Sequence, residues 1–209
     1  MQKSLKPIRV VVYDCDGVLF DSRQANIAYY NNLLARFGKP PLGEDALAVV
    51  HQETVVRSLD FLFRGDARRD EALREIKTID YKPYFRLMTM EPYLVETLRA
   101  LRPGLRTAVA TNRTTTIVPL LIETDLEKHF DLVVSALDVD NPKPHPESLQ
   151  RVAGYFRVEP QYILFIGDSH SDQQAAESAG ALFAAYKNPS LHADFHISDH
   201  RQVLELLKN

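Results

Sequence analysis

The sequence is poor in the residues that build disulfide-bonded, zinc-binding and membrane-spanning proteins. A single cysteine, Cys15, excludes an internal disulfide framework and predicts a reducing compartment, the cytoplasm. The seven histidines lack the spacing of a zinc site. No apolar run approaches the roughly 20 residues of a membrane span. The first one, residues 10–13, meets Asp14 too soon to be the core of a signal peptide. We therefore expect no membrane partner.

Positive charge is not in excess. The formal net charge of the 209-residue chain is −3, and no block of lysine and arginine is present, so the sequence gives no reason to expect a nucleic acid partner. With 45% hydrophobic and 25% charged residues, the composition is that of an ordinary globular protein. The length suits either one sizeable α/β domain or a core domain that carries a smaller insertion. It does not indicate an oligomeric state.

The most informative stretch begins with an apolar run that ends in two carboxylates. Residues 8–13 are mostly β-branched or aromatic and predict a buried strand. Asp14 and Asp16 follow it, and Gly17 permits a sharp turn. Two carboxylates 4 Å apart repel by about 4 kcal/mol at an effective dielectric constant of about 20, so a proton or a cation must relieve them. Taken alone, the pair is also explained by a solvated acidic turn. Cys15 between them is a poor nucleophile, because the carboxylates suppress its thiolate.

The next part of the chain predicts helices only. Helical periodicity starts after Ser22, and residues 44–63 and 67–79 are predicted as two further helices. No strand-like alternation appears before about Met90. We therefore predict a helical domain over residues 22–90, inserted into a core domain formed by residues 1–21 and 91–209.

Strands and helices alternate from Glu91 to the end of the chain. The strands are predicted at residues 106–110, 131–135, 162–166, 182–186 and 195–197. Such alternation is typical of a parallel sheet with helices on both faces. The predicted fold class is thus a Rossmann-like α/β fold with a small all-helical cap domain inserted after the first strand.

Polar residues collect where these strands end. The clusters are Asp14 with Asp16, Thr111 with Asn112, Lys143, and Asp168 with Asp172. In a parallel sheet all the carboxyl ends lie on one edge, so the clusters are expected to converge. Carboxylates beside an ammonium group suit Mg²⁺ and a phosphate. Each cluster alone is better explained as a turn, a surface lysine or a helix cap; the joint order of the clusters favours a site.

These residues resemble the motifs of a known family. Residues 14–22 (DCDGVLFDS) resemble the first motif of the haloacid dehalogenase-like (HAD) hydrolase superfamily. Thr111-Asn112 resembles its second motif, Lys143 its third and residues 167–172 (GDSHSD) its fourth. The helical insertion resembles the cap of the subgroup that contains phosphoglycolate phosphatase and β-phosphoglucomutase.

The resemblance implies a role for each residue. Asp14 is expected to be the nucleophile that forms an aspartyl-phosphate, and Asp16 the general acid and base. Lys143 is expected to neutralise charge. Thr111 and Asn112 are expected to hold the phosphoryl oxygens, and Arg113 beside them to contact substrate. Mg²⁺ is expected on the Asp14 carboxylate, the Asp16 carbonyl and Asp168. Asp172 either binds it through water or orients Lys143.

The predicted activity is Mg²⁺-dependent hydrolysis of a small phosphorylated metabolite. Within the resemblance, an aspartate at position 16 favours phosphate esters, because a leaving alkoxide needs a proton. A phosphomutase and an inactive binding module remain alternatives. The basic side chains of the insertion are candidates to meet an anionic leaving group: His51, Arg57, Arg64, Arg68, Arg69, Arg74, Lys77 and Arg86. The exit from the insertion reads Met90-Glu91-Pro92-Tyr93-Leu94, where relatives usually carry Pro-Gly.

Overall fold

The structure is a computed structural model that describes residues 7–102 and 104–208, without the side chains of Ala48, His51 and Gln52. The chain forms two compact units. One comprises Met1–Phe20 and Met90–Asn209, and the other Asp21–Thr89. The predicted boundaries, after residues 21 and 90, lie one residue further along the chain at both crossings.

The larger unit is built on a six-stranded sheet in which every pairing is parallel. In sheet order the strands are β5 (Leu132–Val134), β4 (Arg106–Ala110), β1 (Val10–Tyr13), β6 (Ile163–Gly167), β7 (Leu182–Tyr186) and β8 (Phe195–Ile197). The predicted α/β class with a parallel, Rossmann-like sheet is confirmed.

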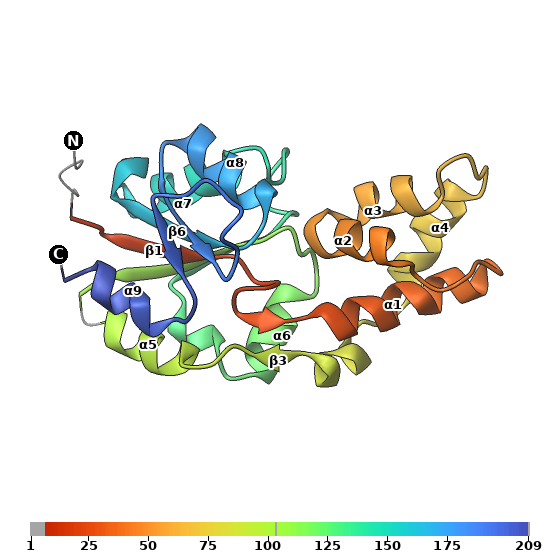
Figure 1. The fold of residues 1–209 in the computed structure, drawn as a ribbon, viewed down its shortest axis with the longest axis horizontal. Helices are drawn as coiled ribbons and strands as arrows, with labels where there is room; N and C mark the ends of the chain where they lie inside the picture. Colours follow the sequence, from red (N-terminus) through yellow and green to blue (C-terminus); the bar gives the residue numbers. More distant parts are fainter. Residues whose placement is uncertain (1–6, 103, 209) are drawn as a thin grey trace. The chain divides into compact units, whose positions relative to one another are not determined.

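Strand β1 lies in the middle of this sheet. Val10 is opposite Arg106 of β4 on one side and Ile163 of β6 on the other. All four β1 residues are buried, because helices cover both faces of the sheet. Figure 1 shows α7 and α8 on one face and α5 and α9 on the other. The helices of this unit are α5 (Leu94–Leu101), α6 (Ile117–Glu123), α7 (Glu147–Phe156), α8 (His170–Ala179) and α9 (Arg201–Leu206), with short 3₁₀ turns η3 (Glu127–His129) and η4 (Pro160–Tyr162).

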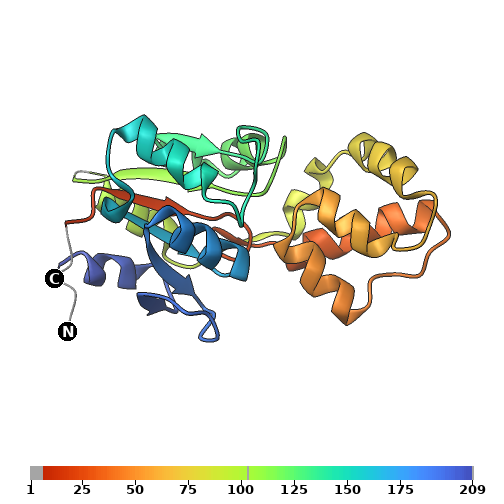
Figure 2. The ribbon, with the colours of Figure 1, turned by 90° about the horizontal axis from the view of Figure 1, so that it is seen from above.

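The smaller unit contains only helices and 3₁₀ turns between residues 23 and 87, as the absence of alternation predicts (Figure 2). Its elements are α1 (Arg23–Arg36), α2 (Glu44–Gln52), α3 (Val55–Leu62), α4 (Arg69–Glu75), η1 (Ile76–Thr78) and η2 (Lys82–Leu87). It has its own buried apolar cluster, which includes Leu33, Leu59 and Ile76.

The single helix predicted over residues 44–63 is wrong. The chain is extended at Glu53, and Thr54 begins a new helix by accepting a hydrogen bond from the Arg57 N–H at 3.4 Å. Threonine is a favoured N-cap residue, so the break had a signal in the sequence. Likewise, the helix predicted over residues 67–79 ends at Glu75 and continues as the 3₁₀ turn η1.

The chain passes between the units through a two-stranded sheet, β2 (Phe20–Asp21) with β3 (Thr89–Met90). These short strands are absent from the sequence prediction. Beyond β3, Tyr93 adopts a left-handed conformation with φ of 63° directly before α5. It therefore takes the backbone conformation that a glycine adopts most easily. Within the described ranges, no helix combines the length and apolarity required to cross a membrane.

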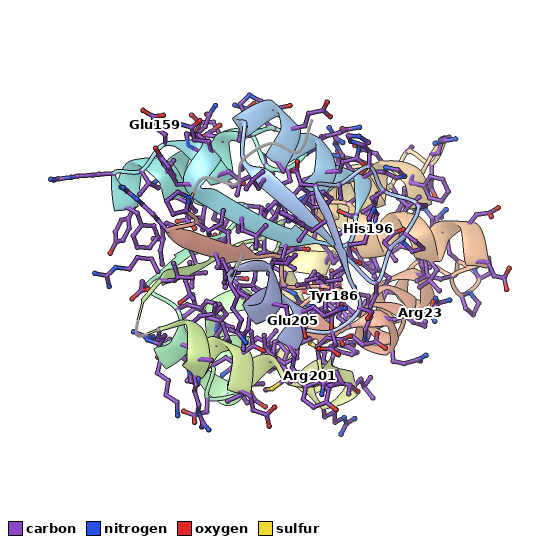
Figure 3. All side chains as sticks on the ribbon, turned by 60° about the vertical axis from the view of Figure 1, so that its left-hand side comes forward. Arg23, Glu159, Tyr186, His196, Arg201 and Glu205 are labelled. Atoms are coloured by element: carbon purple, nitrogen blue, oxygen red, sulfur yellow. The ribbon has the colours of Figure 1, made fainter. Side chains whose placement is uncertain are left out.

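A buried histidine at the start of α9 fixes the loop that follows β1. The ring of His200 stacks on Tyr186 at 4.7 Å between centroids and lies 5.8 Å from the ring of Tyr13. Its Nε2 lies 2.9 Å from the Val18 carbonyl oxygen, to which it donates. Figure 3 labels Tyr186 of β7 and Arg201, the residue of α9 that follows this histidine. The loop carrying the first acidic pair is thus tied to the opposite end of the chain.

Candidate active site

The strand-end residues lie along one edge of the sheet, as predicted for parallel strands. The Asp14 N–H donates to the Ile166 carbonyl at 2.9 Å, and the Thr111 N–H donates to the Val134 carbonyl at 3.0 Å. The ladder of the sheet therefore continues into the residues that follow β1 and β4. Because their backbones are held by the sheet, the points from which their side chains project are fixed.

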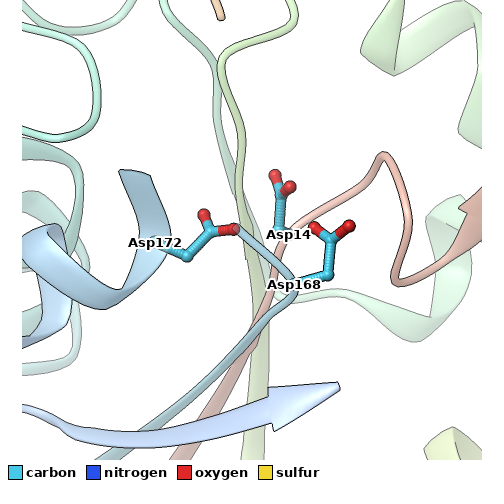
Figure 4. Close-up of side chains that lie close together, drawn as sticks. All are labelled: Asp14, Asp168 and Asp172. Atoms are coloured by element: carbon cyan, nitrogen blue, oxygen red, sulfur yellow. The ribbon is translucent and has the colours of Figure 1, made fainter. Parts of the chain in front are cut away.

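Three carboxylates gather at this edge (Figure 4). One carboxylate oxygen from each of Asp14, Asp168 and Asp172 lies within 4.8 Å of the others. Asp14 follows β1, Asp168 follows β6, and Asp172 lies in the first turn of α8. This cluster contains three of the four residues predicted to hold a metal.

A buried lysine neutralises part of this charge. Lys143 Nζ lies 2.8 Å from Asp14 Oδ1 and 2.5 Å from Asp172 Oδ1, and only 4% of the residue is exposed. Burial acts to lower the pKa of Lys143, but Asp14 and Asp172 outweigh it and raise that pKa above its ordinary value. The lysine is therefore a permanent cation inside the acidic cluster.

One ammonium group does not compensate three carboxylates. Burial, with the charges of Asp172 and Asp16, raises the pKa of Asp14 to about 7 despite Lys143. Burial and the neighbouring Asp172 raise the pKa of Asp168 well above its usual range. The three residues offer only oxygen donors, which is the set that Mg²⁺ and Ca²⁺ take. The cluster thus has the charge and the chemistry of a hard-cation site. Burial also raises the pKa of Cys15, which keeps this thiol protonated as expected.

Asp172 is occupied on both of its oxygens. Its Oδ1 accepts from Lys143, and its Oδ2 accepts from the Ser169 N–H at 3.1 Å and the Ser169 hydroxyl at 2.6 Å. The Ser169 hydroxyl in turn accepts from the Asp172 N–H, which completes a capping box at the start of α8. These contacts favour the role of orienting Lys143 over that of binding a metal.

Asp16 does not belong to this group of three carboxylates and has a different partner. Its two carboxylate oxygens accept from Arg113, Oδ2 from Nε at 2.8 Å and Oδ1 from Nη2 at 2.7 Å. The sequence analysis placed Arg113 beside Thr111 and Asn112 as a residue that contacts substrate. It did not indicate the pairing with Asp16, which lies 97 positions away in the chain. No local pattern reports such a pair.

The second motif supports the lysine loop. The Asn112 side-chain amide donates to the Lys143 carbonyl at 3.0 Å, and the Thr111 hydroxyl accepts from the Arg113 N–H at 3.2 Å. Glu147, in the first turn of α7, accepts from the N–H groups of Asp140 and Asn141 at 2.8 and 3.0 Å. The Lys143–Pro144 peptide bond is cis. These contacts hold Lys143 from both sides of the loop.

Several basic side chains of the smaller unit have acidic partners there. Arg57 pairs with Glu53, Arg68 with Asp66, and Arg69 with both Asp60 and Asp70. These three arginines therefore already have structural roles within the unit. The side chain of His51 lies outside the described residues.

Comparison with known proteins agrees with this site. Residues 11–186 match the family model of the haloacid dehalogenase-like hydrolases. The chain belongs to the haloacid dehalogenase-like hydrolase family. A phosphoglycolate phosphatase of Shigella boydii is 33% identical over an alignment of 199 residues. The match covers 83% of this chain and 79% of that protein. The predicted resemblance, and with it the prediction of a hydrolase, is confirmed.

Solved structures of HAD hydrolases share the fold. A HAD-superfamily hydrolase of subfamily IA from Geobacter sulfurreducens is 39% identical, with a TM-score of 0.86 over 96% of this chain and 100% of that chain. A β-phosphoglucomutase from Clostridium difficile, at 18% identity, has a TM-score of 0.83 and covers 96% of both chains. The second likeness concerns the fold alone.

Proposed function

We propose that this HAD hydrolase cleaves the phosphate ester of a small metabolite through an aspartyl-phosphate on Asp14. The observation that carries this proposal is the Asp14 carboxylate at the end of β1, 2.8 Å from the buried Lys143 ammonium group and beside two further carboxylates. The relative from Shigella boydii, named a phosphoglycolate phosphatase, supports a phosphate ester as substrate.

In the first step, Asp14 supplies the nucleophile. A carboxylate oxygen of Asp14 bonds to phosphorus while the bond from phosphorus to the ester oxygen breaks. The leaving oxygen keeps the electron pair and takes the proton of the Asp16 carboxyl group. Lys143 balances negative charge on Asp14 and on the transferred group, as a positioned cation does in phosphoryl transfer.

In the second step, Asp16 reverses its role. A water molecule attacks phosphorus and gives its proton to the Asp16 carboxylate, while the bond between phosphorus and Asp14 breaks and its electron pair returns to Asp14. Inorganic phosphate leaves, and both aspartates regain their starting states. Thr111 and Asn112, which follow β4, lie in the segment that we expect to hold the phosphoryl oxygens.

The acidic cluster fits Mg²⁺. The raised pKa values of Asp14 and Asp168 reflect buried charge that a divalent cation relieves. Asp14 and Asp168 would hold it, with the Asp16 backbone carbonyl as the remaining protein ligand of the proposal. When bound, Mg²⁺ supplies positive charge that stabilises the phosphoryl oxygens.

The test is hydrolysis of p-nitrophenyl phosphate and phosphoglycolate with Mg²⁺ and then with EDTA. We expect turnover with the metal, loss with EDTA, and no turnover by Asp14→Asn, which keeps the shape of the side chain but removes the nucleophile. The folded state of the variant is checked by its thermal transition. Activity that survives in Asp14→Asn rules out the proposed nucleophile. Equal release of alcohol and inorganic phosphate separates a phosphatase from a phosphomutase, which passes the phosphoryl group to a second hydroxyl.

A further inference from the structure

The loop after β4 carries a buried arginine whose backbone is fixed on both sides. The Arg113 N–H donates to the Thr111 hydroxyl at 3.2 Å, and the Arg113 carbonyl accepts from the Ala136 N–H at 2.9 Å. Only 7% of the Arg113 side chain is exposed. Such burial gives a long side chain little freedom, so its guanidinium group has a defined place.

The guanidinium group binds the Asp16 carboxylate in a bidentate manner. Nε and Nη2 donate to the two carboxylate oxygens at 2.8 and 2.7 Å, and Nη1 donates to the Thr116 hydroxyl at 3.3 Å. Two parallel hydrogen bonds fix the plane of a carboxylate as well as its position, which a lysine cannot do. Thr116 in turn fixes the rotation of the guanidinium group.

The backbone of Asp16 is also held. Asp16 forms a bridge with Phe20, and the Gly17 N–H donates to the Phe20 carbonyl at 2.8 Å. With the backbone set, the remaining freedom of Asp16 is rotation of its side chain, which is 18% exposed. The two hydrogen bonds from Arg113 restrict this rotation.

We propose that Arg113 is a positioning residue for Asp16, and not a ligand of the phosphoryl group. This inference rests on the proposed function, in which Asp16 passes a proton to the leaving oxygen and later takes one from water. Between these two transfers Asp16 is an anion, and the observed pair is the arrangement that stabilises it. Arg113 thus acts on the reaction through Asp16, and its contribution depends on how much the leaving group needs a proton.

This dependence separates the two roles. Ethyl phosphate releases an alkoxide, which must be protonated, whereas p-nitrophenyl phosphate releases a stabilised phenolate. Neither leaving group carries a second anion that an arginine would bind. A residue that positions the acid affects ethyl phosphate most, and a residue that binds the phosphoryl group affects both esters equally and weakens inhibition by inorganic phosphate.

The experiment measures kcat and KM for both esters with Mg²⁺ in the wild-type protein, Arg113→Met, Arg113→Lys, Asp16→Asn and the double variant. Because general acid–base catalysis is typically worth about 10²–10⁴-fold, we expect Arg113→Met to lower kcat for ethyl phosphate about 10–100-fold and that for p-nitrophenyl phosphate far less. KM and the inhibition constant of phosphate should change little. Arg113→Lys, which keeps the charge without the fork, should recover only part of the loss.

The double variant provides the deciding comparison. If Arg113 acts through Asp16, then Arg113→Met has no further effect once Asp16→Asn is present. Equal losses on both esters with weaker phosphate inhibition, additive losses in the double variant, or a gain in kcat each overturn the proposal while leaving the phosphatase in place. Absence of turnover by the wild-type protein overturns the proposed function and this inference together. Arg113→Lys retains a cation in the buried position, so it supplies the same comparison if Arg113→Met does not fold.

Discussion

Gly17 passes so close to the Asp168 carboxylate that a methyl group on its Cα would overlap the carboxylate oxygen. The backbone of Gly17 also has φ of 77°, a conformation that side chains disfavour. We expect Gly17→Ala to destabilise the protein by about 1–3 kcal/mol, the range for strained backbone positions, and to displace Asp168. Chemical unfolding measures the loss of stability. The displacement of Asp168 should weaken Mg²⁺ binding, which is measured by the rise of the thermal midpoint as Mg²⁺ is added.

Gly154 provides the matched control for that substitution. It lies inside α7, and a Cβ there would meet no atom within 4 Å. Alanine favours a helix interior over glycine by roughly 0.5–1 kcal/mol, so Gly154→Ala should stabilise the protein. If both variants lose stability equally, the close approach of Gly17 to Asp168 is not the cause.

Removal of the Lys143 ammonium group should destabilise the protein in a pH-dependent way. Lys143→Met leaves Asp14 and Asp172 buried without their cation, and breaking a buried ion pair on one side costs about 3–5 kcal/mol. Without Lys143 the pKa of Asp14 rises further. The loss should therefore be larger at pH 8 than at pH 6, because the unfolded chain is ionised at both pH values and protonating Asp14 in the folded chain costs more at the higher pH. Urea unfolding at the two pH values measures this.

Lys128→Met is the control, because Lys128 forms an exposed ion pair with Asp125. Exposed pairs contribute little, so no measurable change in the unfolding midpoint is expected at either pH. A loss for Lys143→Met that is the same at pH 6 and pH 8 contradicts the electrostatic explanation.

Asp168→Asn should separate stability from metal binding. Burial and the neighbouring carboxylates disfavour the charge of Asp168, so a neutral amide should raise the thermal midpoint of the metal-free protein. The wild-type protein should gain about 2.7 kcal/mol at a Mg²⁺ concentration 100 times the dissociation constant, and the variant should gain nothing. Asp70→Asn, in the smaller unit, should respond to Mg²⁺ like the wild type. A full Mg²⁺ response in Asp168→Asn excludes Asp168 as a ligand.

His200 should make the protein sensitive to acid. Burial lowers the pKa of His200 from 6.5 to about 4, so the unfolded chain takes up a proton at a higher pH than the folded chain does. The stability present above pH 6.5 is therefore lost as the pH falls toward 4. Linkage gives a loss of about 2 kcal/mol between pH 7 and pH 5 from this group.

The measurement compares urea unfolding at pH 7 and pH 5 for the wild type, His200→Gln and the exposed His192→Gln. Glutamine retains a donor for the Val18 carbonyl but does not titrate, so His200→Gln should show the shallower dependence on pH. His192→Gln should behave as the wild type. An unchanged pH dependence in His200→Gln attributes the acid sensitivity to other groups.

Local patterns in the sequence predicted the sheet and the residues on its edge. Strands β4, β7 and β8 have the predicted bounds, because apolar runs and breaking residues mark their ends clearly. The order of the motifs along parallel strands was sufficient to bring Asp14, Lys143 and Asp168 together. The break at Thr54 was missed because apolar residues on both sides of it suggest one continuous helix.

The sequence could not predict which side chains pair with each other. The hydrogen bonds from Arg113 to Asp16 and from Asn112 to the Lys143 carbonyl join distant segments, and only the packed fold determines them. The same holds for the buried ring of His200, which a sequence presents as one more residue near a chain end. Contacts of this kind depend on distances across the sheet, about which residue spacing carries no information.

The two-stranded sheet formed by β2 and β3 determines where the helical segment joins the larger unit. Because Phe20–Asp21 pairs with Thr89–Met90, the helical segment leaves and re-enters the larger unit at neighbouring points. This segment has neighbouring ends and its own apolar cluster. It can therefore be exchanged as a unit without a change in the path of the rest of the chain. Grafting residues 22–88 from a relative is thus a recombination event that this architecture tolerates, so that the inserted segment and the larger unit are able to change independently.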